Sequence, residues 1–317
     1  MKPASNIVDL NSPAVATSRG ATRAARDARP SRWVDFYELT KPRMNFLVVI
    51  TTMVGFLLAG KNGATDWRLL FHAVLGTALC AAAAAVINQL IERDHDALMP
   101  RTRNRPIPGG RIAPIEAAVL GGAFGVAGVS YLYLLVNPLT ALLGFTTIAL
   151  YLLVYTPAKR FTTLNTVIGA VPGAIPPIMG FTAAQNAVSP AAIALFSILF
   201  FWQMPHFLAI AILYRDDYRA GGFKMLPSVE ENPKLPITGR MMILYSIALI
   251  PVSLFPVMFG VAGPAYFTAA VLLGLAFLSF AISCATSGGL RSDARKLFFA
   301  SIIYLPLLLT AMMLDKI

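Results

Sequence analysis

Long apolar segments, separated by short polar stretches, run through most of the chain. Nine of them reach the length of about 17–25 residues that crosses a bilayer as a helix; they cover residues 44–60, 68–90, 114–135, 138–155, 164–184, 191–213, 239–260, 264–285 and 297–314. They lack the strict alternation of membrane strands. Because a helix satisfies its own backbone hydrogen bonds in lipid, the pattern predicts an all-α integral membrane protein with nine transmembrane helices.

The N-terminal stretch lacks this pattern. Its arginines recur among alanine, serine and proline, at Arg19, Arg23, Arg26, Arg29 and Arg32. Such a composition cannot bury an apolar face, so we predict a disordered basic tail at 1–36 and a transmembrane domain at 37–317. An Arg-rich N-terminus is also typical of an organelle transit peptide. Asp9, Asp27 and Asp35 weaken that interpretation, and a mitochondrial precursor stays the less favoured alternative.

Composition agrees with a membrane protein, and charge predicts its orientation. The chain is 57% hydrophobic and 13% charged, with 26 Lys and Arg against 15 Asp and Glu. A cytoplasmic N-terminus places 23 of the 26 basic residues inside and leaves Lys61, Arg68 and Lys316 outside. Since basic residues favour the cytoplasmic side, we predict a bacterial inner-membrane protein with a periplasmic C-terminus. Topology and anionic lipid headgroups explain the excess of positive charge, so no nucleic-acid partner is predicted.

The second apolar segment ends in an unusual polar sequence, NQLIERDHDALMPRTRNRPIP at residues 88–108. Asn88, Glu92 and Asp96 follow at intervals of four residues, so they share one face of a helix. Stacked carboxylates repel each other unless a cation neutralises them. A few oxygen ligands, completed by water and substrate phosphates, are typical of Mg²⁺. Asp94 points away from this face in an ideal helix and is only a secondary candidate ligand.

Three arginines follow directly, Arg101, Arg103 and Arg105, between Pro100 and Pro106. Guanidinium groups bind phosphate oxygens through paired hydrogen bonds. Beside metal-binding carboxylates, they predict a site for a metal-bound diphosphate. The alternative is a solvated basic loop at the inner membrane surface, and residue types alone favour neither. The carboxylates on one helix face favour the diphosphate site.

Two further polar stretches are predicted at the same membrane face. YRDDYRAGGFK, after the sixth segment, offers Asp217 as a metal ligand, with Asp216 a weaker candidate. YTPAKR, at residues 155–160, offers Lys159 and Arg160, which could bind phosphate. Taken alone, both stretches are better explained as ordinary loop and membrane-anchoring residues. Together with the carboxylates of the second segment, they are candidates for the same metal-diphosphate site.

Two features lie inside the predicted membrane segments. The fifth segment contains Pro172, Pro176 and Pro177 among glycines. These residues would either open the helix beside a cavity or allow close helix packing, and both interpretations stay open. His206 lies within the sixth segment. An ionisable group at membrane depth is a functional candidate, and a hydrogen-bonded core residue is the alternative.

Together, these motifs resemble those of the UbiA-type intramembrane prenyltransferases. The resemblance rests on NxxxExDxD followed by RTxxRP, on YTxxKR, on the Gly/Pro-rich fifth segment, and on PHF, YRDDY and MLP; LTKPR at residues 39–43 also fits. It extends from about residue 33 to the end of the chain. Glu92 stands where the family usually has aspartate, and the second acidic motif is reduced to YRDDY. The resemblance implies a helical bundle around a central cavity that opens to the cytoplasm.

The motifs are most similar to the branch of this family that farnesylates haem b. The resemblance implies transfer of the farnesyl group of farnesyl diphosphate to a haem vinyl group, with water addition, giving haem o and diphosphate. Mg²⁺ is the implied cofactor, and haem b is a substrate. Asn88, Glu92, Asp96 and Asp217 would hold the metal-diphosphate, and His206 would contact haem or assist proton movement. The implied diphosphate-binding residues are Arg43, Arg101, Arg105, Lys159, Arg160, Asn165, Tyr214, Tyr218 and Lys224.

Two other functions remain as alternatives. A prenyltransferase of quinone biosynthesis, acting on an aromatic ring, would share the diphosphate machinery and differ in its acceptor. The PHF sequence and the reduced second motif favour haem. A secondary transporter with broken helices is disfavoured, because such proteins bind substrate near the bilayer midplane, whereas the charges here lie at predicted helix ends. A haem a synthase is a further candidate partner.

Overall fold

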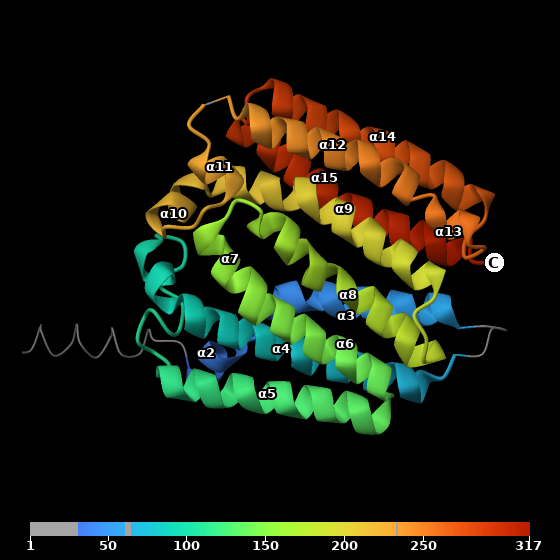
Figure 1. Ribbon diagram of the computed structural model, residues 1–317, viewed down its shortest axis with the longest axis horizontal. Helices are drawn as coiled ribbons and strands as arrows, with labels where there is room; N and C mark the ends of the chain where they lie inside the picture. The colour runs from blue at the N-terminus through green and yellow to red at the C-terminus, as the bar shows by residue number, and fades with distance from the viewer. Residues whose placement is uncertain (1–30, 61–64, 233) are drawn as a thin grey trace, which may run out of the picture.

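Helices form the regular structure in residues 31–60, 65–232 and 234–317, the parts of the chain described by this computed structural model, apart from one isolated β-bridge (Figure 1). Within them, nine helical segments are long and apolar enough to span a membrane. This confirms the predicted all-α class. The spans are α3 (Pro42–Ala59), α4 (Trp67–Leu98), α5 (Pro114–Leu135), α6 (Pro138–Ala149) with η1 (Leu150–Tyr155) and α7 (Thr156–Phe161), α8 (Asn165–Gln185), α9 (Pro190–Leu213), α12 (Pro236–Val252) with α13 (Phe255–Met258), α14 (Pro264–Thr286) and α15 (Arg291–Leu314).

Several helices continue beyond the predicted apolar segments into polar sequence. The second apolar segment ends at residue 90, and α4 continues to Leu98, as the placement of Asn88, Glu92 and Asp96 on one helix face requires. The fourth continues through η1 and α7 to Phe161, and the ninth begins at Arg291 instead of residue 297. Hydropathy reports which residues face lipid, whereas a helix continues for as long as its backbone bonds and polar side chains are satisfied.

The last residues of the predicted tail are helical. Residues 1–30 lie outside the described residues, but residues 32–36 belong to α2 (Arg32–Leu39). Asp35 is 2% exposed, and its Oδ1 lies 2.7 Å from Arg111 Nε. Gln89 Nε2 of α4 donates to the Leu39 carbonyl. A helix of two turns carries too short a hydrophobic pattern to stand out in sequence, and distant partners hold it in place.

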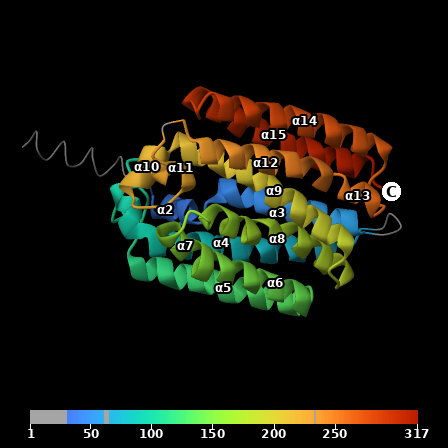
Figure 2. The same ribbon diagram turned by 45° about the horizontal axis from the view of Figure 1, so that its top comes forward.

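The helices run along one common direction and form two packed groups (Figures 1 and 2). In the first, α4 packs against α5 and α3, and α3 packs along α8. In the second, α9 packs against α12 and α15, and α14 packs against both. The α8–α9 contact joins the groups. Short helices α10 (Arg215–Ala220) and α11 (Leu226–Val229) follow α9 at one end, here named the α10 end.

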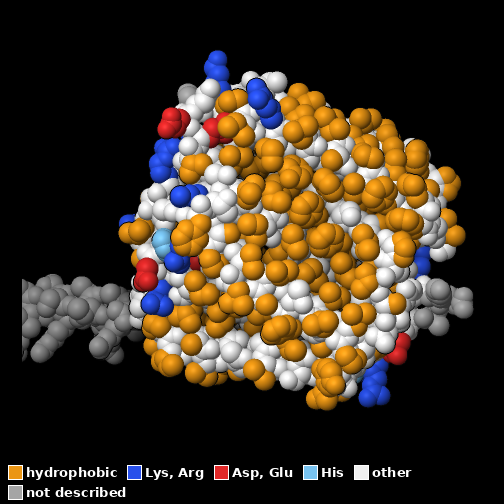
Figure 3. Space-filling model, in the orientation of Figure 1, with side chains coloured by type: hydrophobic (Ala, Val, Ile, Leu, Met, Phe, Trp, Pro, Cys, Tyr) orange, Lys and Arg blue, Asp and Glu red, His pale blue; other side chains and the backbone are white. Residues whose placement is uncertain are grey.

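Apolar side chains cover the middle of the visible face, and charged side chains gather at its edges (Figure 3). Many of the charged groups lie along the edge that carries α2 and α10. This distribution matches a bundle whose apolar belt faces lipid and whose ends face water.

Glycine allows a close backbone contact between α3 and α8. A Cβ on Gly180 would overlap the Thr52 carbonyl oxygen of α3, and a Cβ on Gly55 would overlap the Pro177 carbonyl oxygen of α8. Small residues permit such close approach of helix backbones in membranes. Although it contains Pro172, Pro176 and Pro177, α8 is continuous and these prolines are buried. The structure therefore favours close packing over an opened helix.

We expect Gly180→Ala to lower the free energy of unfolding by about 1–3 kcal/mol, because the added methyl forces two backbones apart. The thermal unfolding midpoint of the purified protein in detergent measures this effect. Gly122→Ala on α5 is the control, because a Cβ there meets nothing within 4 Å. Equal unfolding midpoints for the two variants would contradict this packing.

Candidate active site

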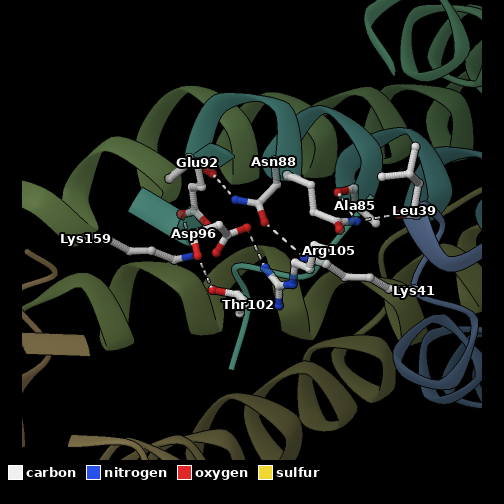
Figure 4. A network of polar contacts seen from close by, with 11 residues as sticks. Leu39, Lys41, Ala85, Asn88, Glu92, Asp96, Thr102, Arg105 and Lys159 are labelled. Atoms are coloured by element: carbon white, nitrogen blue, oxygen red, sulfur yellow. Dashed lines mark hydrogen bonds and ion pairs between the residues drawn. The ribbon is translucent and has the colours of Figure 1, made fainter. Parts of the chain in front are cut away.

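The last turns of α4 carry a buried polar face at the α10 end. Asn88, Glu92 and Asp96 are 1%, 4% and 1% exposed, and Figure 4 shows all three on the same side of the helix. The Asp94 side chain is 81% exposed, as expected for a residue turned away from this face. The four-residue spacing thus places one amide and two carboxylates together in a region shielded from water.

Cations from three separate segments reach this face (Figure 4). Lys159 Nζ of α7 lies 2.7 Å from Glu92 Oε1, and Arg105 Nη1 lies 2.7 Å from Asp96 Oδ2. Lys41 Nζ, from the residue before α3, donates to Asn88 Oδ1 at 3.1 Å. A buried carboxylate is tolerated only when charged partners and hydrogen bonds replace its water. Residues outside α4 therefore neutralise its two carboxylates.

The loop after α4 is folded so that Arg105 points back at Asp96. Thr102 is buried, and its Oγ1 donates to the Asp96 carbonyl oxygen at 2.8 Å. The Arg105 amide then donates to the Thr102 carbonyl oxygen at 2.9 Å. These two bonds place the guanidinium next to the carboxylate, and the role of Arg105 in diphosphate binding stays a prediction.

Lys41, two residues before the candidate Arg43, contacts this face. Arg43 of the LTKPR sequence was expected at the diphosphate, but Arg43 is exposed and Lys41 bonds Asn88. Burial and, to a smaller extent, the nearby Arg105 lower the pKa of Lys41 to about 7, while Glu92 opposes the shift. Lys41 also has a left-handed backbone, φ 49°, a conformation that is costly for a non-glycine residue. Lys41 belongs to the LTKPR sequence, and that motif was the available sign that this residue lies near the site.

The polar sequences after α4 and α9 meet at the α10 end, as the sequence predicted. The Arg101 guanidinium lies 4.6 Å from the ring centre of Tyr214 and 5.8 Å from that of Tyr218. Met99 packs with Ala211 and Phe223 in a small apolar cluster. Arg101, Tyr214 and Tyr218 are therefore brought together by cation–π contacts, beside the carboxylate face.

Asp216 and Asp217 are not brought to the carboxylates of α4. Asp217 is half-buried and Asp216 is exposed, and Asp216 lines a separate recess with Arg215 and Arg291. In the described parts of the chain, no three His, Cys, Asp or Glu side chains gather closely enough to hold a metal ion. The joint role of Asp217 with Glu92 and Asp96 stays a prediction.

Three other candidates hold the backbone around the site. Asn165 is fully buried, and its Nδ2 donates to the carbonyl oxygens of Thr162 and Lys224, at 2.6 and 2.8 Å. The Lys224 amide donates to the Lys159 carbonyl oxygen at 2.7 Å. Arg160 Nη2 donates to the Ile91 carbonyl oxygen on α4 at 3.0 Å. In this structure, Asn165 and Arg160 are bonded to backbone, which accounts for their place beside the site.

His206 lies in a different environment. Its Nδ1 lies 2.6 Å from Ser301 Oγ on α15. Its ring is stacked on Trp202, with centroids 4.8 Å apart, and on Phe298 at 5.3 Å. The structure therefore does not bring His206 to the carboxylate face. These contacts fit the hydrogen-bonded core histidine that the sequence left as an alternative, and a haem contact stays a prediction.

Aromatic rings around Lys159 were missed by the sequence analysis. Lys159 Nζ lies 4.6 Å from the Tyr155 ring centre and 5.8 Å from that of Phe223. Tyr151 packs beside Tyr155, at 5.1 Å between centroids. Both tyrosines belong to the π-helical segment η1, and such segments often occur at functional sites. Tyr155 opens the YTPAKR sequence, so that motif contained the available signal.

The donor set fits Mg²⁺ bound together with a phosphorylated substrate. Asn88, Glu92 and Asp96 present hard oxygen atoms, and Asp96 Oδ1 makes no hydrogen bond within the described residues. Mg²⁺ is commonly held by one or two carboxylates, with water and phosphate oxygens completing its shell. A site with two carboxylates and an amide, surrounded by Lys and Arg, meets that requirement without a third acidic ligand.

The sequence also matches known proteins. Residues 48–303 match the UbiA prenyltransferase family. A protoheme IX farnesyltransferase of Solibacter usitatus (strain Ellin6076) is 42% identical over 291 residues, 89% of this chain and 98% of the relative. The protein of the same name from Opitutus terrae (strain DSM 11246 / JCM 15787 / PB90-1) is 44% identical over 294 residues, 92% and 97% of the two chains.

Solved structures share the fold at low sequence identity. A structure described for digeranylgeranylglyceryl phosphate synthase gives a TM-score of 0.72 at 15% identity, covering 90% of this chain and 98% of that one. A UbiA homologue from Archaeoglobus fulgidus, bound to DMAPP and Mg²⁺, gives 0.64 at 17% identity, covering 88% and 99%. The matched residues, the bacterial relatives and the shared helical bundle show that this chain belongs to the UbiA prenyltransferase family.

Proposed function

We propose that this protein transfers the farnesyl group of farnesyl diphosphate to a vinyl group of haem b. The observation that carries the proposal is the buried carboxylate face of α4, with Lys159 and Arg105 each 2.7 Å from a carboxylate oxygen. Such a site suits a metal-bound diphosphate at the end of a membrane bundle, where an isoprenoid tail can extend into apolar surroundings. The names of the bacterial relatives support haem as the acceptor.

The side chains of the cluster would have two different roles when the diphosphate leaves. Asn88, Glu92 and Asp96 would hold Mg²⁺, which neutralises charge on the phosphate oxygens when bound. Lys41, Lys159 and Arg105 would donate to those oxygens and stabilise the charge that develops as the bond to the farnesyl carbon breaks. An anion arriving next to Lys41 favours its charged form, so this lysine would become a full cation as the substrate binds.

The rest of the reaction needs an apolar pocket and one water molecule. The farnesyl C1–O bond breaks, diphosphate leaves, and C1 forms a carbon–carbon bond with the terminal vinyl carbon. Water then adds to the other vinyl carbon and releases a proton, giving the hydroxyethylfarnesyl chain of haem o. Tyr155, whose ring already contacts a cation, can face positive charge on the allylic group. The surrounding protein delays the approach of water.

The α10 end is proposed to face the cytoplasm of a bacterium. Most basic residues outside the apolar belt belong to loops at this end, as the positive-inside rule requires, and the relatives named above are bacterial. This orientation places the C-terminus in the periplasm. In the proposed arrangement, residues before α2 form a cytoplasmic extension, Asp217 approaches the metal-diphosphate when substrate binds, and a haem a synthase receives the product.

An aromatic-ring prenyltransferase is the second candidate function, because the cluster around α4 binds diphosphate and does not itself select the acceptor. Purified protein supplied with Mg²⁺, farnesyl diphosphate and haem b tests the choice. We expect a haem product heavier by one farnesyl group and one hydroxyl group, with diphosphate released. Diphosphate release only when an aromatic quinone precursor replaces haem would favour the second function, and no release with either acceptor would contradict both.

Asp96→Ala should reduce turnover on the order of a hundredfold or more, because it removes both an oxygen ligand and the partner that orients Arg105. Steady-state diphosphate release measures this loss. Asp94→Ala is the matched control, since it removes an exposed carboxylate two residues away. Both variants should elute from size exclusion like the parent protein. A comparable loss in the Asp94 variant would contradict the assignment of the α4 face.

Lys159→Met should lower the free energy of unfolding by about 3–5 kcal/mol, because it leaves Glu92 buried without its partner. Adding Glu92→Gln should recover most of that stability while activity stays lost. Thermal unfolding of the two variants without Mg²⁺ measures the difference. If the double variant unfolds at the temperature of the single variant, the pair does not compensate charge in the way described.

A further inference from the structure

His95 lies on α4 between Glu92 and Asp96 in sequence, but its side chain contacts the segment that follows α10. Its Nδ1 lies 2.7 Å from the carbonyl oxygen of Gly221, a residue 126 positions later. A carbonyl oxygen only accepts hydrogen bonds, so Nδ1 is the donor. This bond ties the acidic end of α4 to the chain that follows α10.

Residues 221–224, here named the closing segment, are held by three different helices. His95 of α4 donates to the Gly221 carbonyl. The Lys224 amide donates to the Lys159 carbonyl of α7 at 2.7 Å, and the Lys224 carbonyl accepts from Asn165 Nδ2 of α8 at 2.8 Å. Gly222 has φ +72°, a backbone conformation that glycine adopts without strain. The His95 bond fixes the beginning of the segment, and the other two bonds fix its end.

The side chain at the centre of the closing segment reaches the cation of the active site. Phe223 is buried, and its ring centre lies 5.2 Å from that of His95. Lys159 Nζ lies 5.8 Å from the same ring centre. Lys159 is the partner of Glu92. A continuous set of contacts therefore leads from His95 through Phe223 to the charge-neutralising lysine.

We propose that His95 is a positioning residue for diphosphate binding. Its bond to Gly221 fixes the closing segment, so that Phe223 and the Lys224 amide hold Lys159 in the geometry that meets Glu92 and the substrate. His95 itself touches neither substrate nor metal. The nature of the ligand rests on the proposed function, whereas the ordering of the closing segment is a property of this chain alone.

Two substitutions with the same number of side-chain heavy atoms and the same branching separate the hydrogen bond from packing. His95→Asn keeps an N–H donor close to the position of Nδ1, and His95→Leu removes it. Two quantities are measured on the purified full-length protein with Mg²⁺. One is the rate of amide hydrogen exchange in residues 221–224, and the other is the dissociation constant of farnesyl diphosphate by calorimetry, without haem. In the turnover assay, KM and kcat are compared.

For His95→Leu we expect faster exchange and a dissociation constant and KM raised roughly fivefold to tenfold, the effect of losing one hydrogen bond of ordinary strength. The kcat should change much less, because the substrate that does bind still meets the same groups. His95→Asn should restore both quantities close to those of the parent protein. Equal behaviour of the Asn and Leu variants in exchange and in binding would overturn the proposal.

His72→Leu is the matched control. His72 lies on the same helix, near its other end, and its Nδ1 makes a bond of the same length, 2.7 Å, to Tyr131 Oη. This variant should lower the unfolding temperature without altering exchange in the closing segment or affinity for farnesyl diphosphate. A rise in the dissociation constant equal to that of His95→Leu would show general destabilisation and overturn the proposal.

Phe223→Leu tests the contact between Phe223 and Lys159. It also replaces the first test if His95→Leu does not fold. It keeps the His95–Gly221 bond and removes the ring that contacts Lys159. We expect weaker binding of farnesyl diphosphate with slow exchange retained at the Lys224 amide. Unchanged affinity would overturn the route through Phe223. Because exchange and binding are measured without an acceptor, a failure to modify haem would count against the proposed function and leave this test intact.

Discussion

The neutralisation of two buried carboxylates determines much of the architecture at the α10 end. Glu92 and Asp96 lie where α4 is shielded from water, and an isolated carboxylate would not be stable there. Lys159 and Arg105 supply the compensating charge, each at 2.7 Å. Because these two cations come from α7 and from the loop after α4, the helices must assemble in one arrangement before the charges can be buried.

The same interaction makes the cluster suited to its proposed task. In the free protein the cations neutralise the carboxylates, and a magnesium-bound diphosphate would bring both the positive charge that the carboxylates need and the negative charge that the cations need. Replacing the carboxylate–cation pairs by carboxylate–magnesium and cation–phosphate pairs changes the net charge of the site little. A buried site can therefore bind a highly charged group without a large cost of desolvation. Lys41, with its pKa lowered by burial to about 7, adds a group whose charge responds to the arriving anion.

The sequence predicts the helices and the first acidic motif because both depend on local spacing. A four-residue repeat is sufficient to place Asn88, Glu92 and Asp96 on one face, and it also turns Asp94 outward. Several residues around this face could not be predicted in this way. Lys41, Tyr155 and Phe223 reach the cluster only through packing between distant segments, and Lys41 was passed over for Arg43 in the same short sequence.

The acidic residues after α9 show where sequence reasoning is weakest. A pair of neighbouring aspartates shows that a segment is charged, but it does not predict which way each side chain points. In the structure, Asp216 lines a recess away from the α4 carboxylates. His206 illustrates the same limit, since its bond to Ser301 depends on how α9 packs against α15. Residues on one helix can be predicted together, whereas residues on separate helices need the tertiary structure.

The central claim is that the face of Asn88, Glu92 and Asp96 holds the metal of a prenyl diphosphate complex. Anomalous diffraction from crystals grown with Mn²⁺ and a non-hydrolysable farnesyl diphosphate analogue tests it most directly. The account predicts a manganese peak within coordination distance of these oxygen atoms, with the diphosphate beside Lys159 and Arg105. A manganese peak elsewhere, for example in the recess lined by Asp216, with the α4 carboxylates still paired only to their lysine and arginine, would contradict it.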